Sequence, residues 1–543
     1  MALDSVTELA APPAVIQNPV LTGFHPDPSI LRVGEDYYLA TSTFEWFPGV
    51  GLHHSRDLVH WRSLGGALTT EELLQMRGVR DSGGVWAPCL SYADGLFYLV
   101  YSNVGTYGGG FWDTPNFVVT APDITGPWSE PVRLHSLGFD ASMFHDDDGR
   151  SWMLSMAADF RPGREVFAGI VLQEYDRAAR RLRGEPTTIF TGTQAGLVEG
   201  PHLYRHDGWY YLVTAEGGTQ WEHQVTVARS RTIAGPYEVD PAGPMLTSWP
   251  DPTLALQKAG HGSLVATPDG EWYLAHLTGR PLTERGRCVL GRETALQRVE
   301  WSADGWPRVP GGRPSSEVVA PRLEPHPWPA EPERDDFDAL VLGSPWSTLR
   351  RPPSSDWLSL TERPGQLRLY GGESPVSLRD SSLVGRRIEH LSCAFETRVS
   401  SAPATFRHMA GVAAYYNTLN WAYARLTWHE VHGPCVDVLV SDRGRLVNAS
   451  APVPVADPAA GVTLRAELDR ASLRFGYAIG DGALQWWPET HDATRLSDEY
   501  ALEIYDAREK VSGFTGAFFA LWAQDLTGGQ LPADFAYATY ERR

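Results

Sequence analysis

The segment Asp207-Gly208-Trp209-Tyr210-Tyr211-Leu212 decides the fold, because its pattern of a turn followed by an aromatic-rich strand ending in Leu occurs five times. The other copies are Asp36-Tyr37-Tyr38-Leu39, Asp94 to Leu99, Asp148 to Leu154 and Asp269 to Leu274. Successive Leu positions (39, 99, 154, 212, 274) differ by 60, 55, 58 and 62 residues. Asp-Gly before a β-rich run is a strong hairpin signal. Such long units, each a small antiparallel sheet, predict a five-bladed β-propeller rather than a β-sandwich.

The repeat also predicts which side chains face the propeller axis. Stepping back 12 to 14 residues from each repeat Leu reaches Asp27, Trp86, Asp140, Glu199 and His261. Innermost strands surround the central channel, so these five side chains are expected to face one another. Three converging carboxylates raise one another's pKa and desolvation cost, which favours a functional over a structural interpretation.

This set of residues suits glycoside hydrolysis. That reaction needs two carboxyl groups of unlike pKa, and a third carboxylate can orient the acid and raise its pKa. Trp86 is expected either to stack on a sugar or to plug the channel. His261 is expected to donate to a sugar hydroxyl, to bind an axial cation such as Ca²⁺, or to be a structural residue.

Longer motifs resemble glycoside hydrolase family 43, and most of all its two-domain β-xylosidases. They cover almost the whole chain and include residues 18–21, 24–29 (Phe-His-Pro-Asp-Pro-Ser), 40–49, 81–88, 199–204 and 291–295. The resemblance implies an inverting, exo-acting β-xylosidase with α-L-arabinofuranosidase side activity. It also implies that Asp27 is the general base, Glu199 the general acid and Asp140 the pKa modulator. The implied substrate-binding residues are Phe44, Trp86, Thr219, His261, Arg292 and Phe514, and Arg292 is also implied to neutralise and orient the modulator Asp140.

The chain departs from the resemblance at one place. These xylosidases carry an aromatic pair with a Trp before an Asp, whereas this chain has Ala157-Ala158 before Asp159. That Trp helps to form the leaving-group subsite. The departure leaves α-L-arabinofuranosidase open as the main activity. A non-catalytic carbohydrate-binding propeller is a further alternative, but binding needs fewer than three carboxylates.

We predict an all-β chain with a second domain: a propeller over residues 1–310, a Pro-rich linker over 311–333, and a jelly-roll, concanavalin-like sandwich over 334–543 that caps the pocket. Alternation in Leu367-Arg368-Leu369-Tyr370 is typical of half-buried strands. We expect one aromatic cluster of this domain to lie in its core or at an interface, with a sugar-binding surface as the alternative. The cluster consists of Tyr415, Tyr416, Asn417 and Trp421.

Composition limits location and partners. A net charge of −20 disfavours nucleic acid as a partner, and no long apolar run indicates a membrane span. No signal-like N-terminus is evident, and the four scattered cysteines are typical of reduced thiols, so we expect a cytoplasmic protein. The expected partners are small xylo- or arabinoxylo-oligosaccharides. The chemistry requires no cofactor, and homo-oligomer formation is left open.

Overall fold

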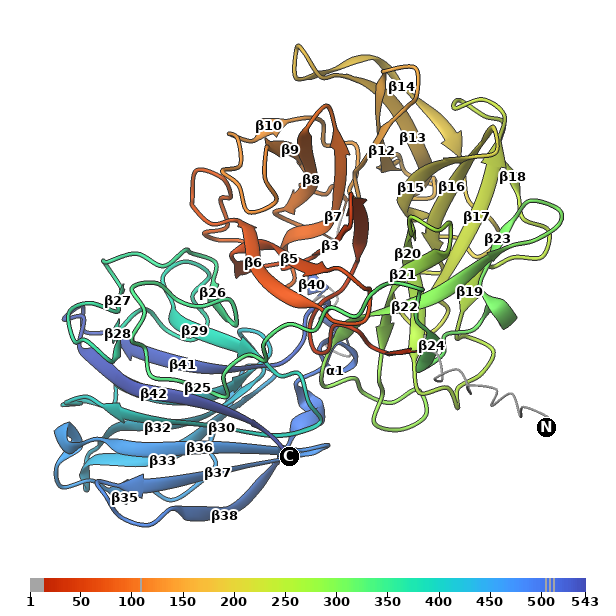
Figure 1. Ribbon diagram of the computed structural model, residues 1–543. Helices are drawn as coiled ribbons and strands as arrows, with labels where there is room; N and C mark the ends of the chain where they lie inside the picture. Colours follow the sequence, from red (N-terminus) through yellow and green to blue (C-terminus); the bar gives the residue numbers. More distant parts are fainter. Residues whose placement is uncertain (1–13, 108–109, 503–504, 507–508, 511–512) are drawn as a thin grey trace, which may run out of the picture.

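The computed structural model describes residues 14–107, 110–502, 505–506, 509–510 and 513–543. Figure 1 shows two all-β domains side by side, a propeller (red to light green) and a sandwich (teal to blue). The predicted all-β class, with a five-bladed propeller followed by a jelly-roll sandwich, is confirmed. Within the described residues, no helix has the length and apolarity that crossing a bilayer requires.

Each propeller blade is an antiparallel sheet whose strands follow one another in chain order. The first two blades contain β2 (Ser29–Val33), β3 (Asp36–Thr41), β5 (Gly49–Ser55) and β6 (Arg62–Leu68), then β7 (Gly84–Ala93), β8 (Leu96–Val104), β9 (Asn116–Ala121) and β10 (Val132–Arg133). The third contains β11 (Ser142–His145), β12 (Ser151–Ala158), β13 (Phe167–Asp176) and β14 (Arg181–Phe190). The last two contain β15 (Glu199–His206), β16 (Trp209–Glu216), β17 (Gln224–Ser230), β18 (Glu238–Val239) and β19 (Leu246–Thr247), then β20 (Gln257–Ala266), β21 (Trp272–Gly279), β22 (Arg292–Trp301) and β23 (Pro307–Arg308).

The repeated turn of the sequence is the hairpin between the first two strands of each blade. In the fourth blade, His206 pairs with Trp209 across the two-residue turn Asp207-Gly208. Both turn residues have positive φ, 47° for Asp207 and 74° for Gly208. A type I′ turn requires this conformation, and its twist matches that of the flanking strands. The Asp-Gly dipeptide therefore sets the register of the blade.

The segment after the last blade lies along the propeller. β24 (Glu317–Val319) pairs with β1 (Val15–Gln17), and a further bridge joins Leu21 to Thr294 on β22. The Tyr273 hydroxyl of β21 donates to the Val319 carbonyl at 3.0 Å. These contacts attach both the N-terminal segment and the residues after β23 to the fifth blade.

The second domain is a sandwich of two antiparallel sheets. One sheet has the order β27 (Leu358–Ser359), β28 (Leu367–Tyr370), β42 (Pro532–Arg542), β30 (Ser392–Ser400), β36 (Val462–Asp469), β37 (Ser472–Ile479) and β38 (Gln485–Asp492), with β25 (Arg334–Asp335) paired to β42. The other has the order β34 (Arg445–Asn448), β33 (Gly433–Asp442), β32 (Trp421–His429), β31 (His408–Tyr415), β41 (Phe518–Asp525), β29 (Ser382–Arg387), β26 (Trp346–Leu349) and β4, with β35 (Val453–Pro454) paired to β33. The remaining elements are η1 (Pro310–Gly312), η2 (Pro458–Ala460), η3 (Ala493–Arg495), α1 (Asp498–Leu502), β39 (Tyr505–Asp506) and β40 (Glu509–Lys510).

The aromatic cluster of the sandwich lies inside the protein. Tyr415, Tyr416 and Trp421 are at most 2% exposed, and Asn417 is also buried. These residues cannot form a sugar-binding surface, so that alternative is wrong and the core interpretation holds.

The two domains share a sheet. β4 (Trp46–Phe47) lies between β3 and β5 in the chain, yet it pairs with β26 of the sandwich through Phe47–Thr348 and Trp46–Leu349. The Trp46 ring stacks on Phe518 of β41 with centroids 3.9 Å apart. A strand of the propeller therefore forms the edge of a sandwich sheet, and its Trp is packed into that domain.

A buried ion cluster lies beside this shared strand. Arg350, which follows β26, donates to Asp81 at 2.6 Å and to the Val79 carbonyl at 2.6 Å. Glu45, which precedes β4, accepts from the Ser82 backbone N–H at 3.1 Å. Burial raises the pKa of Glu45 to about 8, although Arg350 acts in the opposite direction. One sandwich cation thus pairs with a propeller carboxylate, Asp81, beside a Glu45 that keeps its proton at neutral pH.

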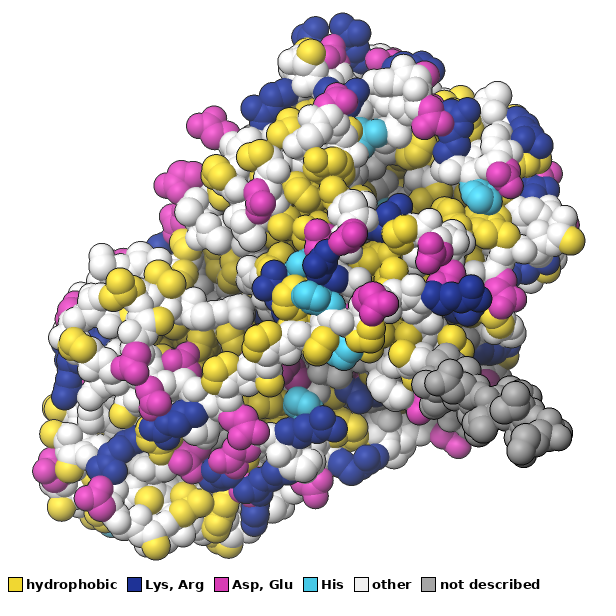
Figure 2. Space-filling view, in the orientation of Figure 1, with side chains coloured by type: hydrophobic (Ala, Val, Ile, Leu, Met, Phe, Trp, Pro, Cys, Tyr) yellow, Lys and Arg dark blue, Asp and Glu magenta, His cyan; other side chains and the backbone are white. Residues whose placement is uncertain are grey.

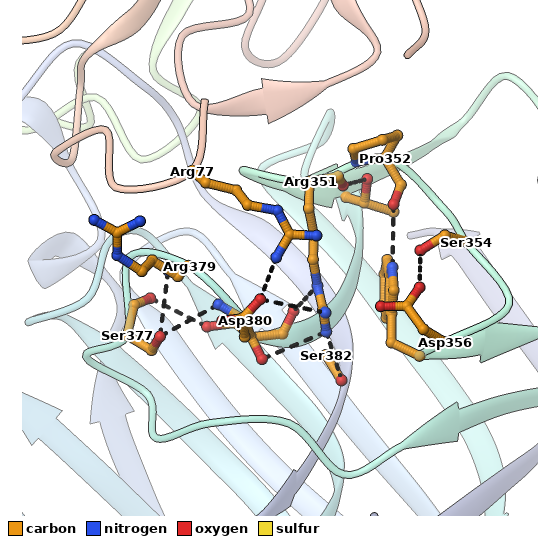
Figure 3. A network of polar contacts seen from close by, with 12 residues as sticks. Arg77, Arg351, Pro352, Ser354, Asp356, Ser377, Arg379, Asp380 and Ser382 are labelled. Carbon is orange, nitrogen blue, oxygen red and sulfur yellow. Dashed lines mark hydrogen bonds and ion pairs between the residues drawn. The ribbon is translucent and has the colours of Figure 1, made fainter. Parts of the chain in front are cut away.

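Other polar contacts extend this interface. Figure 3 shows Arg77 of the propeller reaching Asp380 of the sandwich, where Arg351 also approaches. Arg351 donates to the Ser382 hydroxyl at 3.0 Å. A partly exposed pair such as Arg77–Asp380 contributes little stability, so the buried Arg350 cluster is the stronger link.

We expect Arg350→Met to lower the free energy of unfolding by about 3 kcal/mol, because Asp81 loses its buried cation. Urea unfolding followed by Trp fluorescence measures this loss, and both domains should unfold in one transition. Arg445→Met, at an exposed arginine of β34, is the matched control and should be neutral. Equal stabilities of the two variants would contradict the role of the cluster.

Candidate active site

A pocket of about 540 Å³ lies where the inner strands of the blades converge. All nine residues that the sequence analysis assigned to catalysis or substrate binding line it. They are Asp27, Phe44, Trp86, Asp140, Glu199, Thr219, His261, Arg292 and Phe514. Eight come from the propeller, and Phe514 comes from the sandwich. The structure thus brings the predicted set together in one place.

The backbone is kinked at or beside each of the five inner-strand positions that the repeat predicts. The residues with a left-handed conformation at these positions are Asp27 (φ 54°), Ala87 (30°), Asp140 (55°), Gly200 (57°) and His261 (49°). The strand register shifts at this point in the second, fourth and fifth blades. Left-handed residues other than Gly cost about 1–2 kcal/mol each, and bulges redirect side chains. The kinks therefore direct the five predicted inner-strand residues toward the pocket, and they lower the stability of the fold.

Asp27 is held as an anion by a cation and a hydroxyl. Ser42 donates to its Oδ2 at 2.6 Å, Arg292 donates to its Oδ1 at 3.2 Å, and His261 Nδ1 lies 4.0 Å from Oδ1. Burial acts to raise the pKa of Asp27, but Arg292, His261 and the Ser42 hydrogen bond together keep this pKa below its ordinary value. Asp27 is therefore ionised at neutral pH.

Glu199 and Asp140 have the opposite tendency. Burial, and then the negative charge of Asp27, raise the pKa of Glu199 to about 8. Burial and the neighbouring Glu199 raise the pKa of Asp140 well above its usual value, although the Gly200 N–H donates to Asp140 Oδ2 at 3.0 Å. The pocket therefore contains an ionised carboxylate beside a protonated one at neutral pH.

Arg292 links the pocket to the sandwich. Its guanidinium donates to the Phe514 carbonyl at 2.8 and 3.3 Å, in addition to Asp27. Asp498 of α1 lies 3.7 Å from Arg292 Nε and accepts from the Tyr416 hydroxyl at 2.7 Å. Arg292 is only 3% exposed. Two groups of the sandwich therefore position the cation that keeps Asp27 ionised.

The pocket walls are aromatic. The Trp86 ring lies 5.8 Å from Phe44 and 5.3 Å from Phe514, and its Nε1 donates to the Ser82 carbonyl at 2.9 Å. Trp86 thus forms a wall and leaves the pocket open. Sequence reasoning missed other lining residues, among them Tyr107, Phe139, Phe167, Leu197 and Glu222. Phe139 precedes Asp140 directly, whereas Tyr107 and Phe167 lie outside the inner-strand register and carried no signal.

The residues around His261 do not fit a protein-bound Ca²⁺. This ion takes about six to eight oxygen ligands at about 2.3–2.6 Å. The neighbouring carboxylate oxygen, Asp27 Oδ1, is already bonded to Arg292. Within the described part of the chain, no group of three or more His, Cys, Asp or Glu side chains is placed to hold a metal.

Comparison with known families identifies both domains. The model for "Glycosyl hydrolases family 43" matches residues 16–307. The model for "Beta xylosidase C-terminal Concanavalin A-like domain" matches residues 334–541.

Individual proteins resemble the chain over nearly its full length. A crystal structure of xylan β-1,4-xylosidase from Bacillus halodurans C-125 is 51% identical with a TM-score of 0.94, covering 97% of this chain and 100% of that one. A xylan 1,3-β-xylosidase of a Vibrio species is 46% identical over 97% of this chain and 99% of its own length. A xylosidase/arabinosidase of Humicola insolens is 46% identical over 97% of each chain.

We expect Asp140→Asn to stabilise the folded protein at alkaline pH. Because the folded pKa of Asp140 lies above the unfolded one, stability falls as the pH rises between them, and a neutral amide avoids that loss. The variant should be more stable than the parent by about 1–2 kcal/mol at pH 8. The difference should shrink toward pH 4. Urea unfolding at both pH values measures it.

The exposed Asp481 supplies the control, since Asp481→Asn should follow the parent at both pH values. A lower stability of Asp140→Asn at both pH values would show that the buried carboxyl does not destabilise the fold.

Proposed function

The chain belongs to glycosyl hydrolase family 43, and from this membership we propose that it releases xylose from the non-reducing ends of xylo-oligosaccharides as an inverting β-1,4-xylosidase. The sequence resemblance to this family is confirmed. Relatives that cover nearly the whole chain are named as xylosidases, which supports the same activity here.

One observation carries the proposal: a pocket that holds an ionised carboxylate and a protonated carboxyl together. Glu199 retains its proton at neutral pH and can transfer it to the glycosidic oxygen as the bond to the anomeric carbon breaks. Asp27 is ionised and can remove a proton from the water that attacks this carbon from the opposite face. Water replaces the leaving group, and the configuration is inverted. Exchange with solvent then moves the proton from Asp27 back to Glu199.

Asp140 and Arg292 support this pair. Asp140 and Glu199 are neighbouring buried carboxyls, and the charge of Glu199 acts to raise the pKa of Asp140, so the two resist ionising together, which suits an acid that must remain protonated. Arg292 bonds Asp27 and lowers its pKa. The two catalytic carboxyls thereby keep different protonation states within one buried site.

The pocket supports exo action. Phe44 and Trp86 provide apolar surfaces for a pentose ring, and Phe514 adds a surface from the sandwich. His261 and Thr219 lie among the lining groups that can bond sugar hydroxyls. A volume of about 540 Å³ suits a chain end rather than a passing polymer. The substrates proposed are small xylo- or arabinoxylo-oligosaccharides.

Arabinofuranosidase activity is the second candidate, as a side activity or as the main one. The Humicola relative is named for both activities. β-D-Xylopyranose and α-L-arabinofuranose place similar hydroxyls around the anomeric carbon, so one pocket can accept both. A purely carbohydrate-binding role is the alternative that hydrolysis of any glycoside would refute.

We further propose a cytoplasmic enzyme that binds neither nucleic acid nor membrane. All four cysteines are buried and unpaired, as suits a reducing compartment. Figure 2 shows acidic and basic side chains interspersed over the visible face, without a basic stripe of the kind that binds phosphate backbones. A homo-oligomer is compatible with these features, and sedimentation analysis would determine the assembly.

We expect an aryl β-D-xyloside to be hydrolysed with a higher kcat/KM than an aryl α-L-arabinofuranoside. Proton NMR of the reaction should show α-xylose before mutarotation, because water attacks opposite the leaving group. β-Xylose as the first product would rule out inversion. A larger kcat/KM on the arabinofuranoside would make arabinofuranosidase the main activity, and turnover of neither substrate would leave the binding alternative.

We expect Glu199→Gln to lose about 10³-fold of kcat/KM on xylobiose but far less on an aryl xyloside, since a good leaving group needs little protonation. In the parent, activity should fall as the pH rises through about 8, where Glu199 ionises. As the pH is lowered, activity should fall only below the ordinary pKa of an Asp side chain, where Asp27 becomes protonated. With the aryl substrate, the activity of Glu199→Gln should not fall at alkaline pH.

Glu222→Gln, an exposed carboxyl at the same pocket, is the matched control and should keep the alkaline limb. Equal losses on both substrates in Glu199→Gln would exclude Glu199 as the acid.

A further inference from the structure

An exposed aromatic patch adjoins the catalytic pocket. It consists of Phe111 and Trp112, between β8 and β9, and Phe160, between β12 and β13; we call these three residues the mouth patch. Phe111 is 79% exposed. Phe111, Trp112 and Phe160 contact one another, and a contiguous apolar patch beside a binding site is typical of a surface that contacts a ligand.

The mouth patch is continuous with the pocket. The Trp112 ring lies 4.9 Å from Tyr107 and 5.6 Å from Phe139, both of which line the pocket. Phe160 then lies 5.3 Å from Trp112 and 5.1 Å from Phe111. Aromatic rings therefore form an unbroken surface from the pocket wall to solvent.

Local bonds lie beside both parts of the mouth patch. Thr106 and Asp113 form an antiparallel bridge, and the Gly105 N–H donates to the Asp113 carbonyl at 2.8 Å. In the other loop, Arg161 pairs with Asp159 at 2.6 Å. The Asp159 N–H donates to the Val166 carbonyl at 2.9 Å. Backbone bonds of described residues thus lie close to the exposed rings on both sides of the patch.

The mouth patch provides aromatic surface close to a strand end that has only small side chains. β12 ends at Ala157-Ala158, with an irregular register between them, and neither side chain can stack on a sugar. Phe160 follows two residues later and packs on Trp112 of the neighbouring blade. The aromatic surface thus lies at the rim of the pocket rather than at the end of the strand.

We propose that the mouth patch binds the xylosyl residues of the leaving group that lie beyond the first, so that the enzyme favours oligosaccharides longer than xylobiose. This inference rests on the proposed function. The glycone enters the pocket as a chain end, and the remainder of the chain must leave through the open rim. Pentose rings present apolar C–H faces along a β-linked chain, and such faces pack on aromatic rings.

The test compares kcat/KM for an aryl xyloside, xylobiose, xylotriose and xylotetraose. In the parent, kcat/KM should rise with chain length. Phe111→Ala and the double variant Phe111→Ala/Phe160→Ala should lose about tenfold on xylotetraose and almost nothing on the aryl xyloside or xylobiose. Phe111 is exposed, so its single variant should remain folded, and a thermal melt checks this.

Phe406→Ala is the matched control, because Phe406 is a 50% exposed ring on the sandwich. It should leave every substrate unchanged. An unaltered dependence of kcat/KM on chain length in the double variant would overturn the proposal. This holds even if sedimentation showed that the variant had lost a contact between copies of the chain. Failure of the parent to hydrolyse any of the four substrates would instead refute the proposed xylosidase function.

Discussion

The guanidinium of Arg292 is the contact on which the rest of the site depends. It is buried where the domains meet, and its donors bond Asp27 of the first blade and the Phe514 carbonyl of the sandwich, with Asp498 close by. A buried cation that loses its partners destabilises a protein by several kcal/mol. Removing the sandwich would leave Arg292 without two of its three neighbours. The pocket and the domain interface are therefore one structure and not two adjoining ones.

The same guanidinium gives three chemically similar carboxyl groups different pKa values. Asp27, Asp140 and Glu199 are all buried carboxyls at one register of the propeller, yet only Asp27 is bonded by the guanidinium. Its pKa is lowered while those of the other two are raised. Symmetry of the blades supplies three acids in one place, and an asymmetric cation gives them unlike protonation states. The blades repeat one architecture, whereas the chemistry depends on a cation that bonds only one of the three carboxyl groups.

Sequence reasoning reached the propeller and the five register residues because both follow from a repeat. Asp-Gly turns set hairpins locally, and equal spacing places equivalent residues on equivalent strands. Phe44, Arg292 and Phe514 came only from family resemblance, since no local pattern marks them. The left-handed kinks at Ala87 and Gly200, the pairing of β4 with β26, and the walls formed by Tyr107 and Phe167 could not be predicted. Each depends on contacts between distant segments, which local propensity does not encode.

The strand shared between the domains has a consequence for how the chain is made on the ribosome. Phe47 pairs with Thr348, which is synthesised 301 residues later (348 − 47). At about 5–20 residues per second, the first blade waits roughly 15–60 seconds before the partner of β4 emerges. Until then Trp46 and Phe47 have no sheet to join, and their apolar rings remain available to other nascent chains or to chaperones. The first blade to be translated is thus among the last parts of the molecule to be completed.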